Sequence, residues 1–97
     1  MRRVLREGRP YRGERVVAFV ARGAGEAGFV AGRRIGKAVA RNRARRVLRS
    51  AWREVAPQVV PGTDVVWVAR EPIRGARTRD LVAEMIELLR RAEVVTA

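Results

Sequence analysis

The sequence predicts an α+β fold, a small two-layer protein in which helices pack on one sheet. Two observations carry this prediction: two segments repeat apolar residues at helical spacing, and three short apolar runs have the length of strands. The segments follow the order helix, strand, strand, helix, strand, helix, which fits a layered α+β domain. With 97 residues, the chain is expected to form a single domain over residues 1–97.

The first third of the chain predicts a short helix and two strands. Residues 2–7 read as a helix that ends at Gly8, and Pro10 breaks the pattern after it. Residues 15–22 contain an unbroken apolar run, typical of a strand that is covered on both faces. Residues 27–31 form a second strand candidate after a glycine-rich turn, so we expect the two strands to form an antiparallel hairpin.

Residues 38–55 give the clearest helix signal. At 3.6 residues per turn, one stripe is apolar and the other side is cationic, with Arg41 and Arg45 at the border. The apolar stripe consists of Ala44, Val47, Leu48, Ala51, Trp52 and Val55. Pro57 is expected to close this helix.

The remaining chain predicts one strand and one helix. Residues 64–69 are the third strand, and residues 71–75 are a loop. Thr78 is the expected N-cap of a last helix that runs to about residue 92, with Asp80 near its positive end. Glu84 and Glu87 share a face with Asp80, and we interpret all three as the solvated side of this helix.

Net charge is the most informative number. The chain carries +12, from 22 Lys+Arg and 10 Asp+Glu, and the whole excess lies within residues 1–55. Of the cations, 21 are Arg and one, Lys37, is Lys. Arg binds phosphate in a bidentate manner and stacks on bases, so the segregated charge indicates a polyanionic partner.

Several classes of function are excluded. The chain has no Cys and no His, which excludes disulfides, Cys/His zinc sites and Ser-His-Asp or Cys-His nucleophilic catalysis. No phosphate-binding loop of the Gly-Lys-Ser/Thr type is present. The uncharged stretches are far shorter than a membrane span of about 20 residues, and no signal peptide is visible, so we expect a cytoplasmic protein without a membrane partner.

Residues 33–53 hold nine cations and no acid. A solvated helix face normally mixes charges, because like-charged pairs four residues apart destabilise a helix by a few tenths of a kcal/mol each. Arg45 forms such pairs with both Arg41 and Arg49, so a negatively charged partner is expected here. The residues predicted to contact this negatively charged partner are Arg33, Arg34, Lys37, Arg41, Asn42, Arg43, Arg45, Arg46, Arg49 and Arg53.

The aromatic residues divide into two groups. Trp52 and Trp67 lie on predicted core positions. Tyr11 and Phe19 are open to two interpretations, because an aromatic ring on a sheet either packs in the core or stacks an unpaired base.

The string Gly36-Lys37-Ala38-Val39-Ala40-Arg41-Asn42-Arg43-Ala44-Arg45-Arg46-Val47-Leu48-Arg49 resembles the signature of the bacterial ribonuclease P protein subunit. The similarity extends to residues 6–9 and to the strand at residues 64–70. The resemblance implies a ribosomal-protein-like α/β sandwich with a mixed sheet, in which the Arg-rich helix links parallel strands through a left-handed crossover. It also implies that the chain starts inside the family's first helix, which would then be truncated.

The resemblance further implies a role in endonucleolytic removal of the 5′ leader from precursor tRNA. The RNA component and Mg²⁺ would perform the hydrolysis, and the protein would bind that RNA and the single-stranded leader without binding a metal itself. The implied leader cleft contains Leu5, Tyr11, Val17, Phe19 and Arg70. Met1 and Leu5 stand where the family commonly has aromatic residues.

Two rival functions remain at this point. A small basic ribosomal protein that binds ribosomal RNA and has no enzyme role would carry a similar charge. A helix-turn-helix DNA binder would need a second short helix next to the cationic helix, and the predicted strands on either side of it argue against DNA as a partner.

Overall fold

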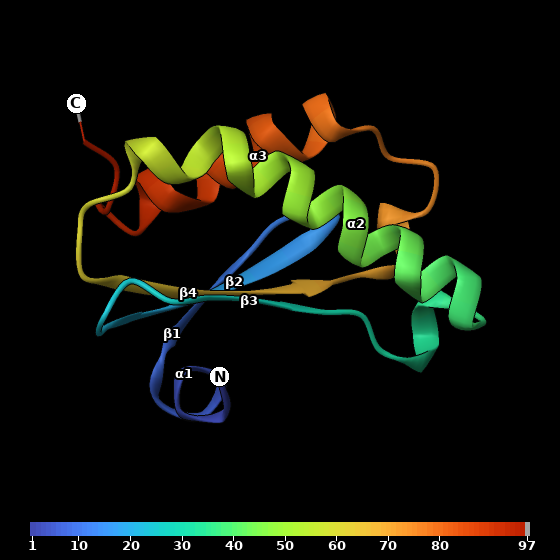
Figure 1. Ribbon diagram of the computed structural model, residues 1–97, viewed down its shortest axis with the longest axis horizontal. Helices are drawn as coiled ribbons and strands as arrows, with labels where there is room; N and C mark the ends of the chain where they lie inside the picture. Colours follow the sequence, from blue (N-terminus) through green and yellow to red (C-terminus); the bar gives the residue numbers. More distant parts are fainter. Residues whose placement is uncertain (97) are drawn as a thin grey trace.

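The computed structural model describes residues 1–96 of the chain, so Ala97, the last residue of the predicted domain, lies outside the described part. A four-stranded sheet carries α2 and α3 on one face and α1 on the other (Figure 1). The elements in chain order are α1 (Arg2–Glu7), β1 (Arg9–Arg12), β2 (Val16–Arg22), β3 (Ala27–Val30), the 3₁₀ turn η1 (Arg33–Ile35), α2 (Ala38–Val55), η2 (Ala56–Gln58), β4 (Thr63–Ala69), η3 (Glu71–Ile73) and α3 (Thr78–Arg91).

The sheet is mixed, and its strand order is β1-β2-β4-β3. β2 is antiparallel to both β1 and β4, whereas β3 is parallel to β4. The Arg-rich helix α2 therefore connects two neighbouring parallel strands, β3 and β4, as expected for the predicted mixed sheet. The predicted α+β architecture is confirmed.

The predicted hairpin between residues 15–22 and 27–31 is wrong, because β4 lies between β2 and β3. β4 is the most deeply buried strand, with six of its seven residues buried. A strand covered on both faces also needs partners on both edges for its backbone groups. β2 and β3 supply one edge each, and Gly23 N–H donates to Gly62 O at 2.8 Å to start the wide turn between them.

The sequence pattern did not reveal β1. Its residues, Arg9-Pro10-Tyr11-Arg12, are polar and include a proline, which lowers their strand propensity. β1 lies at the sheet edge, where Pro is tolerated because its missing N–H breaks no interior ladder bond. Pairing with β2, rather than local propensity, makes this segment a strand.

The core lies between the sheet and the helices α2 and α3. Val16 and Ala18 of β2 are fully buried there, together with Leu48 of α2 and Leu89 of α3. Trp67 is also fully buried. Its ring lies 5.8 Å from that of the half-buried Trp52, at an interplanar angle of 56°, so the prediction of core positions for both tryptophans is confirmed.

The start of α3 and the role of Glu84 differ from the expectation. Thr78 is the first helical residue and Arg77 is the N-cap, whose N–H donates to the Asp80 carboxylate at 2.9 Å. Glu84 is not solvated. Its side chain is 10% exposed and accepts the N–H groups of Arg15 at 2.8 Å and Val16 at 2.9 Å. This contact between helix and sheet depends on tertiary packing, which the helical periodicity does not encode.

Asp64 connects three separate parts of the fold. Its buried carboxylate accepts the N–H groups of Gly25 and Glu26, each at 2.8 Å, and pairs with the guanidinium of Arg3. The hydrogen bond from Glu26 N–H is the main cause that lowers the pKa of Asp64, and Gly25 and Arg3 lower it further against the opposing effect of burial. One residue of β4 thus fixes the turn between β2 and β3 and also the position of α1.

We predict that Asp64 contributes to acid sensitivity. Since its pKa in the folded protein lies below the ordinary value of 3.8, its contribution is present above that value and is lost as pH falls through the folded pKa. We expect the free energy of unfolding, measured with urea from about pH 6 to about pH 2, to fall steeply with pH for the wild-type protein. It should fall less steeply for Asp64→Asn. Equal slopes would contradict this role, and Glu87→Asn, an exposed position on α3, is the control.

Candidate nucleic-acid interface

The cationic surface of α2 follows from the way the helix packs. Ala44, Leu48, Ala51 and Val55 are buried against the sheet side. The residues on the opposite side of the helix therefore face outward, because the helix repeats every 3.6 residues. Asn42, Arg43, Arg46, Arg49 and Arg53 are exposed, and Arg41 and Arg45 are half-buried at the border, as the sequence predicts.

Few of these cations are satisfied within the protein. Arg43 Nη2 donates to the carbonyl of Ala76 at 3.1 Å, and Arg45 donates to Oδ1 of Asn42. The Arg49 guanidinium lies 5.6 Å from the ring centre of Phe29, a cation–π distance. Within residues 1–96, the ion pairs involve cations of other elements, so the positive charge of α2 is left without an acidic partner.

The connection into α2 extends the same surface. Arg33 and Arg34 of η1 and the N-cap Lys37 are all exposed. The first turn of α2 contains no acidic residue, and Lys37 makes no side-chain cap. The free N–H groups and positive dipole end of the helix therefore add to the charge of these three cations. Gly36 permits the turn, because its φ of 134° is strained for other residues.

A second surface lies on the face of the sheet opposite α2 and α3. Val16 and Ala18 face the core, so the alternating residues Val17 and Phe19 face the other way, and both are half-buried. Opposite Val17 on β4 is Val68, which is also half-buried. This leaves an apolar strip that is open to solvent over part of its length.

α1 covers the other part of this face (Figure 1). Its Val4 is buried and borders a small cavity together with Gly28 and Val66. Met1 lies so near that a Cβ at Gly28 would approach its Sδ to 2.6 Å. Leu5 is half-buried on the same helix. The structure therefore brings Leu5, Val17 and Phe19 to one face of the sheet.

Tyr11 does not join this group. In the register of β1 with β2, it stands opposite Ala18, and directly paired residues share a face. Tyr11 is half-buried against the core on the side of the helices, and the Arg9 guanidinium lies 5.9 Å from its ring centre. Its predicted place in the same cleft as Val17 and Phe19 is wrong, because β1 and its register were not visible in the sequence.

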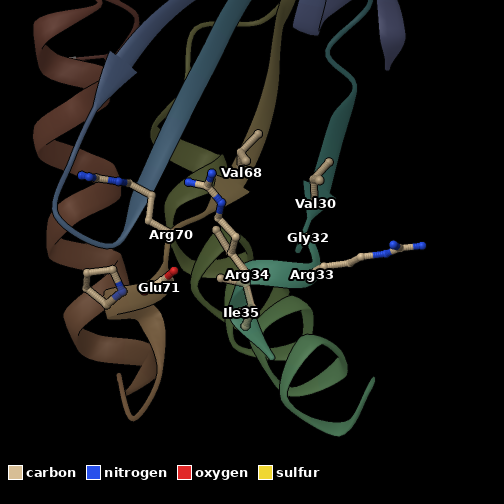
Figure 2. Close-up of a pocket in the computed structure, with 10 residues that line it drawn as sticks. Val30, Gly32, Arg33, Arg34, Ile35, Val68, Arg70 and Glu71 are labelled. Atoms are coloured by element: carbon tan, nitrogen blue, oxygen red, sulfur yellow. The ribbon is translucent and has the colours of Figure 1, made fainter. Parts of the chain in front are cut away.

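A cavity of about 480 Å³ opens where β3 and β4 end. Its lining comes from β3, η1, β4 and η3: Val30, Gly32, Arg33, Arg34, Ile35, Val68, Ala69, Arg70, Glu71 and Pro72. Figure 2 shows Arg34 extending beside Val68, whereas Arg33 extends away from it. Arg34 thus connects the cationic surface of η1 and α2 with the apolar strip of the sheet.

The position of Arg70 is defined by a backbone contact. It lines the cavity, but its Nη1 donates to the carbonyl of Gly13 at 2.6 Å and its side chain extends toward the turn between β1 and β2 (Figure 2). Glu71, which follows it, is a cavity residue that the sequence analysis missed. The available signal was an acid two residues after the end of β4, in an otherwise cationic neighbourhood.

Among residues 1–96, no three acidic side chains gather into a possible metal-ligand group. In the same part of the chain, no helix combines the length and the apolar character that crossing a membrane requires.

Comparison with known proteins identifies relatives over nearly the whole chain. The family model described as Ribonuclease P matches residues 1–93. The ribonuclease P protein component of Chloroflexus aggregans is 40% identical, over 98% of this chain and 73% of its own length. That of a Roseiflexus species is 45% identical, over 72% of this chain and 58% of its own length.

Solved structures agree with the fold. The ribonuclease P protein of Staphylococcus aureus has a TM-score of 0.77 at 20% identity, covering 98% of this chain and 90% of its own. The Thermotoga maritima protein has a TM-score of 0.77 at 23% identity, covering 91% and 86%. From the family match, the close relatives and the shared fold together, we conclude that the chain belongs to the ribonuclease P protein family.

Proposed function

We propose that this ribonuclease P protein binds the RNA subunit of the enzyme through α2 and η1, and the 5′ leader of precursor tRNA through the free face of the sheet. The observation that carries the proposal is the run of cations on α2 that have no acidic partner. Family membership favours this role over that of a ribosomal protein. A DNA-reading helix pair is not favoured, since α2 lies between β3 and β4 in the chain.

The RNA surface would act by neutralising phosphates. Like-charged neighbours such as Arg45 and Arg49 repel each other in the free protein, and a phosphate backbone removes this repulsion. The side chains of Arg41, Arg46 and Arg53 make no hydrogen bond within the described chain, so their guanidinium groups are available for bidentate phosphate contacts. Asn42 holds Arg45, which limits the freedom of that side chain before RNA binds.

The leader surface would act by stacking and apolar contact. Phe19 is half-buried on the free face, where one ring can stack an unpaired base. Val17 and Leu5 provide apolar contacts on the same face, and Arg34 stands between this strip and the cations of α2. Arg70 would contribute by holding the turn at Gly13, and by contacting the leader once that hydrogen bond opens.

We assign the hydrolysis to the RNA subunit and to Mg²⁺ held mainly by that RNA. The protein supplies cations that lower the repulsion between two polyanions, which increases the effective affinity of the complex for Mg²⁺. We also propose the cytoplasm as the location, because precursor tRNA is made there.

Cleavage at low Mg²⁺ tests the function directly. Ribonuclease P RNA is incubated with precursor tRNA at a Mg²⁺ concentration where the RNA alone is slow, and the protein is then added. We expect a marked increase in cleavage at the mature 5′ end, and the increase should shrink as Mg²⁺ rises. Absence of stimulation at every Mg²⁺ concentration would contradict the proposed function.

The double variant Arg41→Ala/Arg45→Ala tests the RNA surface. Each lost phosphate contact should reduce the slope of log K against log salt by about 0.7–0.9, so two contacts reduce it by about 1.5. The matched control is Arg79→Ala/Arg90→Ala, which removes the same charge from exposed positions of α3. Circular dichroism checks that both variants fold, and an equal change of slope in the two would argue against a surface specific to α2.

The leader surface is tested by two aromatic positions on opposite faces of the sheet. Phe19→Ala should weaken binding of leader-bearing precursor tRNA to the holoenzyme by roughly 5- to 150-fold, because one base stack is worth about 1–3 kcal/mol. Binding of mature tRNA, which has no leader, should not change. Tyr11→Ala should leave leader binding unaffected if the variant folds, and a larger effect from Tyr11 than from Phe19 would reverse the assignment of the faces.

A further inference from the structure

The cavity at the ends of β3 and β4 combines apolar side chains, a cation and an acid. Val30 and Val68 supply apolar side chains from neighbouring strands, and Arg34 supplies a guanidinium that extends beside Val68 (Figure 2). At about 480 Å³, the cavity falls within the size range of small-molecule sites. An apolar wall with a planar cation beside it suits a flat heteroaromatic ring, such as a nucleobase, since guanidinium planes stack on bases.

Glu71 makes the cavity unlike a simple phosphate site. It is the acid among the lining residues, and the other charged ones are Arg33, Arg34 and Arg70. The ion pairs within residues 1–96 join Arg3 to Glu7 and Asp64, and Arg15 to Glu84. Glu71 is exposed at the start of η3 and takes part in none of them. A carboxylate at this point repels phosphate, so it weakens a site that serves the backbone alone.

A carboxylate does favour hydrogen-bond donors on a base. Ionised Glu is an acceptor with two oxygens. The Watson–Crick edge of guanine presents N1–H and the N2 amino group side by side, two donors that match those oxygens. Adenine and cytosine each place an acceptor nitrogen beside their amino group, and uracil places its imino group between two carbonyls, so each of these bases brings an acceptor against the carboxylate.

We propose that Glu71 makes this cavity selective for a guanosine of the single-stranded leader. The inference rests on the proposed leader-binding function and adds to it a residue that determines specificity. Arg34 stacks on the base, the valines beside the guanidinium add apolar contacts, and Glu71 accepts hydrogen bonds from N1–H and N2–H. Bidentate recognition of this kind discriminates between bases by about tenfold or more.

The experiment uses the holoenzyme, reconstituted from the protein and ribonuclease P RNA, with precursor tRNAs whose leaders are otherwise uridine. A single guanosine is moved through the leader one position at a time, and the dissociation constant is measured at fixed salt. We expect one position at which guanosine binds about tenfold tighter than adenosine, cytidine or uridine. Inosine at that position, which lacks the N2 amino group, should lose most of the gain.

Glu71→Gln should bring the ratio of the dissociation constants for guanosine and for the other bases close to one. The affinity for every leader should rise slightly, because the variant no longer repels phosphate. Glu87→Gln, which makes the same charge change at an exposed position of α3, should keep the ratio. No preferred guanosine position, or a preference that survives Glu71→Gln, overturns the proposal. Equal binding of leader-bearing and mature tRNA would instead refute leader binding itself, so the two failures are distinguishable.

Discussion

Burial of β4 is the constraint on which the rest of the structure depends. Trp67 and its neighbours on this strand are removed from water, so the strand needs cover on both faces and hydrogen-bond partners on both edges. β2 and β3 take the two edges, and the chain must then cross between the parallel strands β3 and β4. α2 is that crossing, and its apolar stripe covers one face of the strand it leads to.

The same constraint separates two kinds of surface. Because the apolar stripe of α2 packs on the sheet, its cations face away from it, and they continue through Lys37 into η1. The opposite face of the sheet receives the small helix α1, which covers Gly28 and Val66 but leaves Phe19 half-buried. A cationic surface and an apolar strip therefore lie on opposite sides of one thin sheet, with Arg34 and the cavity at the edge where they meet.

Acidic residues have positional roles in this basic protein. Asp64 holds the turn between β2 and β3 and the first helix, and Glu84 fixes the start of β2 against α3. Asp80 binds the N–H of Arg77 where α3 begins, which lowers the pKa of its carboxyl group. These carboxylates are occupied by backbone N–H groups, which distinguishes them from Glu71 at the cavity.

The sequence by itself determined the features that depend on near neighbours in the chain. The bounds and stripe of α2, the border positions of Arg41 and Arg45 and the burial of Trp67 follow from helical or strand periodicity and from charge. Tertiary structure decided what depends on distant residues: the insertion of β4 between β2 and β3, the pairing that makes β1 a strand, the face of Tyr11 and the burial of Glu84. A local pattern does not indicate which strand will be the neighbour, since pairing joins residues that are far apart in the chain. Register also depends on this pairing, because a shift of one residue moves every side chain to the other face of the sheet.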